Sequence, residues 1–286
     1  MAQQQKAADR KSVKNKIITT AVVCAILAVV AYVLVTFVFF KIETIQVVSV
    51  SGDSKVSDYY TADEIINASE IDIGDNMFRL SADKISAEIQ QELPYIGSVT
   101  IKRKIPSTLN IVVEDTSPAY GIESNGSFIL LNSNYKVLGI EDYLPQGAAK
   151  IVGVEFSSLD HGKTAVFADE SDANRFRTLV DSCAQGGLTN ITKYDIENIA
   201  NINVVINSRI TIIFGTMTDL TEKLSLALKT MNKELENNPD VHIIINITDS
   251  ERSYVRNDTS PLEEDTVDYE EYSMRQETTD NLVAVG

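Results

Sequence analysis

The chain is poor in the residues that most often carry catalysis, metal binding or disulfide bonds. Its 286 residues include no tryptophan, two histidines and two cysteines. His161 and His242 do not form a His-Glu-x-x-His motif, which argues against a zinc protease, and no Gly-x-x-x-x-Gly-Lys-Ser/Thr loop is present to bind phosphate. Without tryptophan, the usual lining of a sugar subsite is also missing. The sequence therefore predicts a protein that is not an enzyme and that uses no cofactor, no metal and no small-molecule substrate.

The two cysteines are not expected to form a disulfide. Cys24 lies in a long apolar segment, whereas Cys183 lies on the apolar face of a helix expected near residues 172–184. That position makes Cys183 a core residue rather than a nucleophile. The acidic residues are numerous, so counting alone leaves open a pair of carboxylates for sugar hydrolysis.

Charged residues are absent from Ile17–Phe40, a segment of 24 residues. As a helix it would be about 36 Å long, enough to cross a hydrocarbon core of about 30 Å. The preceding 16 residues contain five lysines or arginines and one acid, which predicts a cytoplasmic N-terminus. A cleaved signal peptide would have a shorter apolar core and a small-residue cleavage site. We therefore expect residues 1–16 in the cytoplasm, a transmembrane helix from Ile17 to Phe40, and the rest of the chain outside.

The net charge of −16 is unevenly distributed. Residues 1–16 carry +4, so the predicted external part carries −20. This acidity argues against nucleic acid and against an anionic lipid surface as partners, because both require clustered lysine and arginine. One basic cluster, Lys102-Arg103-Lys104, stands out in the external part. It is either the polar end of a hairpin or a contact for an acidic partner or for lipid head groups near the anchor.

The first external block, residues 41–117, predicts the order strand, helix, helix, strand, strand. Thr61 and Glu64 form a capping box at the first helix, and Ser81 caps the second. Alternating apolar residues predict strands around Val48, around Val99 and from Leu109 to Val113. Two helices would then cover one face of a small mixed sheet.

The second block, residues 118–249, predicts a further α+β domain. A hairpin is expected around Asn132-Ser133-Asn134, and a second one around Asn207-Ser208. An amphipathic helix from Asp219 to Glu236 precedes a β-branched strand, Val241–Thr248. Residues 250–286 are rich in acids and poor in large apolar side chains, which predicts a disordered acidic tail.

The first block resembles the POTRA domain of the FtsQ/DivIB cell-division proteins. The resemblance rests on Ile45–Gly52, Gly74–Phe78, Leu93–Ile96 and above all Val99–Glu114. That last segment has the family's basic strand end, x-Pro turn and alternating strand ending in glutamate. After Pro118 the resemblance lies in layout more than in letters.

The resemblance implies a non-enzymatic scaffold at the division septum of a bacterium, anchored by one membrane span. It implies binding to FtsB/DivIC-type and FtsL-type division proteins, with a partner adding a strand at the end of the second domain. The segment Ile243–Val255 is the candidate, with Tyr254 and Val255 as side chains for specificity. Ile243, Ile245 and Ile247 are candidates too, although alternate strand positions face inward and favour a core role. Another anchored POTRA-type envelope scaffold and a membrane-anchored wall hydrolase are the alternatives.

Overall fold

The computed structural model describes residues 19–30, 32, 40–52, 54–258 and 266–267. Residues 19–30 are helical, and Phe40 lies in a turn. Ile17 and the predicted cytoplasmic residues 1–16 lie outside the described residues. Across the described part of the chain, no helix combines the length and the apolar character that crossing a membrane requires.

The chain divides into two compact units between Asp115 and Thr116, two residues before the predicted boundary. The first unit runs in the order β1 (Thr44–Ser49), α2 (Ala62–Ala68), α3 (Ala82–Glu92), β2 (Ile96–Lys104) and β3 (Thr108–Asp115). This is the predicted strand, helix, helix, strand, strand order. β3 is the central strand, parallel to β1 and antiparallel to β2.

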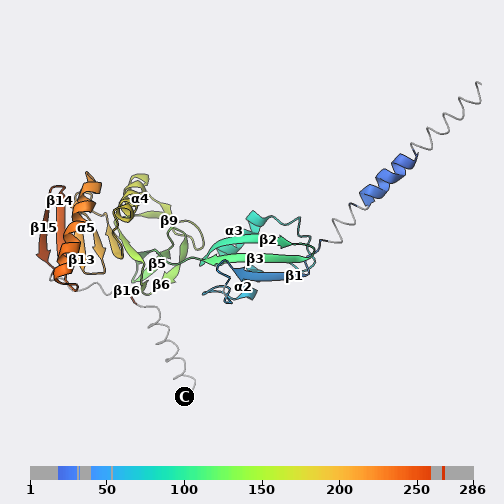
Figure 1. Cartoon of the computed structure of the whole chain (residues 1–286), viewed down its shortest axis with the longest axis horizontal. Helices are drawn as coiled ribbons and strands as arrows, with labels where there is room; N and C mark the ends of the chain where they lie inside the picture. The colour runs from blue at the N-terminus through green and yellow to red at the C-terminus, as the bar shows by residue number, and fades with distance from the viewer. Residues whose placement is uncertain (1–18, 31, 33–39, 53, 259–265, 268–286) are drawn as a thin grey trace, which may run out of the picture. The chain divides into compact units, whose positions relative to one another are not determined.

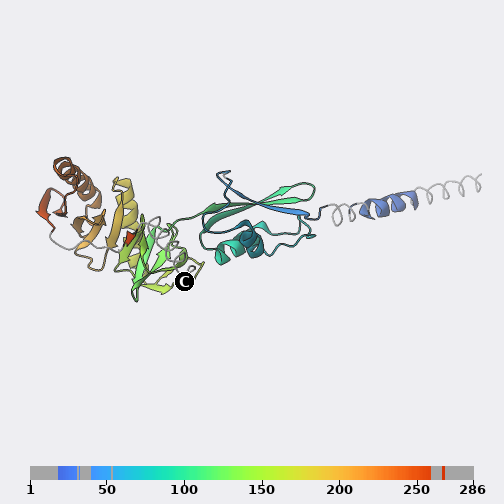
Figure 2. The ribbon, with the colours of Figure 1, turned by 90° about the horizontal axis from the view of Figure 1, so that it is seen from below.

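Local hydrogen bonds explain where the two helices of the first unit begin. The Glu64 N–H donates to Thr61 Oγ1, and the Thr61 N–H donates to the Glu64 carboxylate, which completes the predicted capping box. Ser81 accepts from the Lys84 N–H in the same way. Both helices lie on one side of the sheet (Figure 2), where Ile65 and Ile89 are buried with Leu109 and Ile111.

The second unit is built on a nine-stranded sheet (Figure 1). Its strands occur in the spatial order β15, β14, β13, β12, β11, β8, β4, β5, β6. Their bounds are β4 Tyr120–Ser124, β5 Ser127–Leu131, β6 Val137–Glu141, β8 Ala149–Val152, β11 Ile191–Asp195, β12 Ile202–Ile206, β13 Ile210–Gly215, β14 Ile243–Asp249 and β15 Arg252–Asn257. Four short strands complete the described part, in two separate pairs: β9 (Phe156–Ser158) with β10 (Val166–Phe167), and β7 (Leu144–Pro145) with β16 (Thr266–Val267).

Helices α4 (Glu170–Gln185) and α5 (Leu220–Asn237) pack on the same face of this sheet. The inward side chains form one cluster with Phe176 of α4 and Leu224 of α5. Within α5, the buried Lys223 ammonium donates to the carbonyl oxygens of Phe214 and Thr216, each at 3.0 Å. The start of α5 is thereby tied to the end of β13, which it follows in the chain.

Helix α5 starts at Leu220, one residue after the predicted start, and Asp219 at the N-cap has φ 53° and makes no side-chain cap bond. The structure corrects one expectation about the second unit. The predicted tail does not begin at Ser250, because residues 252–257 form strand β15 paired with β14. The parts of that tail at 259–265 and 268–286 lie outside the described residues.

Candidate partner-binding edge

Strand β15 is the last strand at one end of the nine-stranded sheet. It pairs with β14 on one side, with Ile245 opposite Val255 and Asn246 opposite Tyr254. α5 supports it from one face, where Thr230 Oγ1 lies 3.0 Å from Ser253 Oγ. The other side of β15 is an open strand edge among the described residues.

The hydrogen-bond pattern identifies which backbone groups point to the open edge. The Asp258 N–H donates to the carbonyl oxygen of His242 at 2.9 Å, so it points toward β14. Successive N–H groups of an antiparallel strand alternate in direction. The N–H groups of Ser253, Val255 and Asn257 therefore point outward, where an added strand could accept from them.

The two side chains predicted to give specificity lie on opposite faces of this edge. Val255 shares a face with Ile245 and α5, and 40% of it is exposed. Tyr254 lies on the uncovered face beside Asn246 and is 61% exposed. An extended segment bound along β15 would therefore contact Tyr254 on one face of the sheet and Val255 on the other.

The three isoleucines predicted with them have a different place. Ile243, Ile245 and Ile247 belong to the core, with at most 1% of each exposed. β14 is not an edge strand, because β13 and β15 flank it. These side chains therefore cannot reach a partner directly, and they fix the position of the strand on which β15 rests.

Sequence reasoning missed that Arg252–Asn257 is a strand. The sequence contains a local signal for this strand, because a turn-forming Asp249 is followed by the β-forming residues Tyr254 and Val255. In the structure, the Glu251 N–H donates to the Asp249 carboxylate at 2.9 Å within that turn. Acid-rich composition after residue 250 masked this hairpin.

The basic triplet lies at the end of β2 in the first unit. Lys102 and Lys104 are exposed. Arg103 donates through Nε to the carbonyl oxygen of Met77 at 2.7 Å and through Nη2 to that of Leu80 at 2.9 Å. Arg103 therefore holds the loop between residues 77 and 80 against the hairpin.

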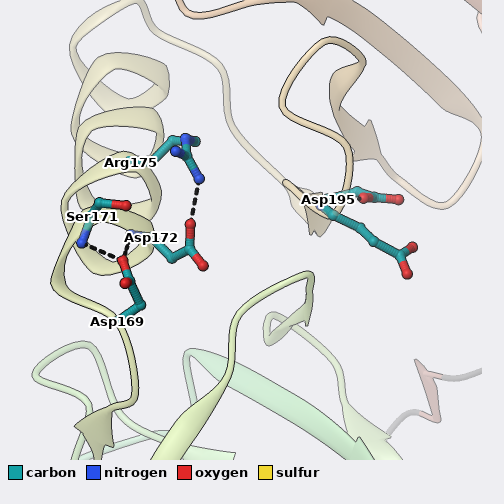
Figure 3. A network of polar contacts seen from close by, with 6 residues as sticks. Asp169, Ser171, Asp172, Arg175 and Asp195 are labelled. Carbon is teal, nitrogen blue, oxygen red and sulfur yellow. Dashed lines mark hydrogen bonds and ion pairs between the residues drawn. The ribbon is translucent and has the colours of Figure 1, made fainter.

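Acidic side chains lie close together at the start of α4 and are candidates for the paired carboxylates that a hydrolase would need (Figure 3). The Asp169 carboxylate caps the helix by accepting from the N–H groups of Ser171 and Asp172, and hydrogen bonding with Ser171 and Asp172 lowers its pKa. Asp172 forms an ion pair with Arg175. Both carboxylates thus have a structural task at the helix start. Among the described residues, no three metal-ligating side chains lie close enough together to hold a metal ion.

Cys183 is fully buried in the core cluster, as expected from its position on α4. Burial raises the pKa of its thiol to about 12. We expect Ellman's reagent at pH 8 to label Cys183 more than about a hundredfold slower in the folded protein than in urea, because the thiolate is the reactive form. A Cys24→Ser variant isolates this thiol, and rapid labelling without denaturant would contradict the burial.

Comparison with known proteins agrees with this architecture. Residues 41–115 match the family described as POTRA domain, FtsQ-type. The chain is 24% identical to the cell division protein DivIB of Clostridium acetobutylicum over 186 residues, 64% of this chain and 72% of that protein. It is 28% identical to the cell division protein FtsQ of Corynebacterium glutamicum over 152 residues, 53% of this chain and 64% of that protein. A DivIB of Lactococcus lactis is 31% identical over 116 residues, 39% of this chain and 29% of that protein.

The fold and these matches define an α+β protein with an FtsQ-type POTRA domain followed by a β-rich second domain. Residues 41–115 thus form an FtsQ-type POTRA domain, and the chain is similar to the FtsQ and DivIB cell-division proteins of bacteria.

Proposed function

We propose that the protein is a bitopic scaffold of the division machinery in the bacterial cell membrane. Ile17–Phe40 crosses the bilayer once, residues 1–16 lie in the cytoplasm, and the POTRA domain and the β-rich second domain (the β domain) act outside at the septum. Support comes from the uncharged segment with its basic N-terminal flank, from the helical residues 19–30 within it, and from the family. Confinement to one membrane raises the effective concentration of weak docking surfaces.

The proposed partners are FtsB/DivIC-type and FtsL-type proteins, anchored in the same membrane. The observation that carries the proposal is the open edge of β15. A strand edge offers a row of unused backbone donors and acceptors, and an extended peptide satisfies them by joining the sheet. Tyr254 and Val255, exposed on opposite faces, add side-chain contacts on both sides of the new strand.

Replacing Val255 by proline tests this edge. Proline removes the outward N–H of residue 255 and places its ring where the partner strand would lie, but it removes no bond to β14. The wild-type chain should bind the extracytoplasmic segment of an FtsB/DivIC-type protein, and Val255→Pro should weaken that binding about tenfold or more. The measurement is calorimetric titration with the full chain in detergent.

Two further variants separate the contribution of the backbone to partner binding from that of the side chains. Val255→Thr keeps the N–H and the side-chain shape, so its binding should stay within about threefold of wild type. Tyr254→Ala should weaken binding about tenfold, since exposed aromatic residues are frequent interface anchors. Circular dichroism melts verify that each variant folds. Failure of the wild type to bind would refute the partner assignment, whereas normal binding by folded Val255→Pro would refute only the edge.

A further inference from the structure

Three segments meet at one end of the POTRA domain, where β1 starts and the β2–β3 turn lies. The Met77 N–H donates to the carbonyl oxygen of Phe40 at 3.0 Å, and the Ile42 N–H donates to that of Asp75 at 2.8 Å. The Glu43 N–H donates to the carbonyl oxygen of Ser107 at 2.9 Å. Residues 40–43, 72–80 and 102–107 therefore form one surface, which we call the β1-start surface.

Large apolar side chains are exposed on the β1-start surface. Ile73, Phe78 and Ile105 are exposed by 65%, 55% and 62%. The Phe78 ring also packs edge-on against the Phe40 ring, with centroids 4.9 Å apart. These side chains belong to turns rather than to a sheet face, and they project where no other described element of the domain covers them.

The same surface is basic, although the chain as a whole is acidic. Its cations are Lys41, Arg79, Lys102, Arg103 and Lys104, and its acids are Glu43, Asp72 and Asp75. Two of the acids are engaged locally: the Glu43 carboxylate accepts from Ser107 Oγ, and the Asp75 carboxylate accepts from the Asp72 N–H. Arg103 bonds to uncharged backbone carbonyls, so its positive charge is not neutralised by those bonds.

We propose that the β1-start surface rests on an anionic lipid headgroup layer, with Ile73, Phe78 and Ile105 at the interface and Lys102 and Lys104 near lipid phosphates. Exposed apolar side chains beside lysines suit the boundary between acyl chains and head groups. The inference rests on the proposed anchor, because Phe40 ends the apolar segment and is itself part of this surface. The chain would therefore deliver the surface to the bilayer as it leaves it.

This contact gives the POTRA domain a preferred orientation. With the β1 start at the lipid, the strands rise from the membrane rather than lying along it. Strand β2 has nine residues, so the opposite end of the sheet would stand about 30 Å above the lipid. Glu92, at the end of α3, and Lys55, in the loop after β1, lie toward that opposite end.

The test uses the full chain reconstituted in vesicles of phosphatidylcholine with roughly one third phosphatidylglycerol, an anionic lipid. An environment-sensitive fluorophore is attached at Ile73→Cys or, as control, at Glu92→Cys, in the Cys24→Ser background. Cys183 is buried and needs no replacement. Lipids spin-labelled near the head group should quench the residue-73 probe at least about threefold more than the residue-92 probe, because contact quenching is short in range and the control stands about 30 Å away.

Charge reversal completes the test. Lys104→Glu should reduce quenching at residue 73 by about half, whereas Lys55→Glu, with the same charge change at the opposite end, should leave it unchanged. Equal quenching at residues 73 and 92 would overturn the inference. If quenching is equal but Lys104→Glu weakens partner binding, the basic cluster serves an acidic protein instead. A chain that does not float with the vesicles on a density gradient would refute the anchor itself.

Discussion

Gly153→Ala should lower the free energy of unfolding of the β domain by about 3–5 kcal/mol. Gly153 follows β8 with φ +79°, a conformation in which a Cβ atom is strained. The added Cβ would also overlap the backbone of Glu197 and lie 2.7 Å from the carbonyl carbon of Ile196. Because these are backbone atoms of the segment after β11, neither can move without disturbing the β8–β11 pairing. Urea unfolding followed by circular dichroism measures the loss.

Gly147→Ala is the matched control for this prediction. Gly147 has φ +89°, but its added Cβ would meet nothing within 4 Å. This variant has the conformational strain without the steric overlap, so it should lower the free energy of unfolding by about 1–2 kcal/mol. Equal losses for the two variants would show that the backbone near Glu197 relaxes freely, which would contradict the close approach of the two segments.

Phe176→Ala should destabilise the β domain by about 3–5 kcal/mol, the usual range for removing a buried phenylalanine. Phe176 of α4 is fully buried among the rings of Tyr120, Tyr135 and Tyr194, with centroids 5.7, 6.1 and 5.7 Å away. Three aromatic rings fixed on different elements cannot collapse into the space, so a cavity remains. The same urea unfolding experiment measures the effect.

Phe176→Leu provides the comparison, since it retains most of the buried volume. Phe176→Leu should lower the free energy of unfolding by about 1–2 kcal/mol. The cavity in Phe176→Ala should also lower the pKa of Tyr120 and Tyr194, which burial raises above the usual tyrosine value. An ultraviolet titration detects the ionised phenol. A loss below about 1 kcal/mol for Phe176→Ala would contradict the role of this ring in the core.

The POTRA domain was predictable because its signals are local. The capping box at Thr61 and the cap at Ser81 determine where helices start within a few residues. Alternating apolar residues mark β2 and β3. In the β domain, by contrast, β8 has four residues and pairs in parallel with β4 and β11, which are distant in sequence. A strand this short shows little alternation of apolar and polar residues. Its neighbours in the sheet are determined by long-range packing and not by the local sequence.

The binding role of the candidate site stays a prediction. Tyr254 and Val255 were expected to give specificity, and both are exposed. Which strand forms the edge depends on the spatial order of nine strands, and sequence alone placed it one strand too early. Ile245 consequently appeared near the edge, although it lies under β15 in the core.

The charges on β15 also bear on self-association. Arg252 and Arg256 flank Tyr254 on the same face of the strand and are exposed. If two copies joined edge to edge in antiparallel fashion about Tyr254, Arg252 of each would stand opposite Arg256 of the other. Like charges at directly opposed positions are destabilising, and charged side chains are a common protection of sheet edges. The strand thus disfavours this homodimer, and a peptide bound at the proposed edge would gain from acids at those two positions.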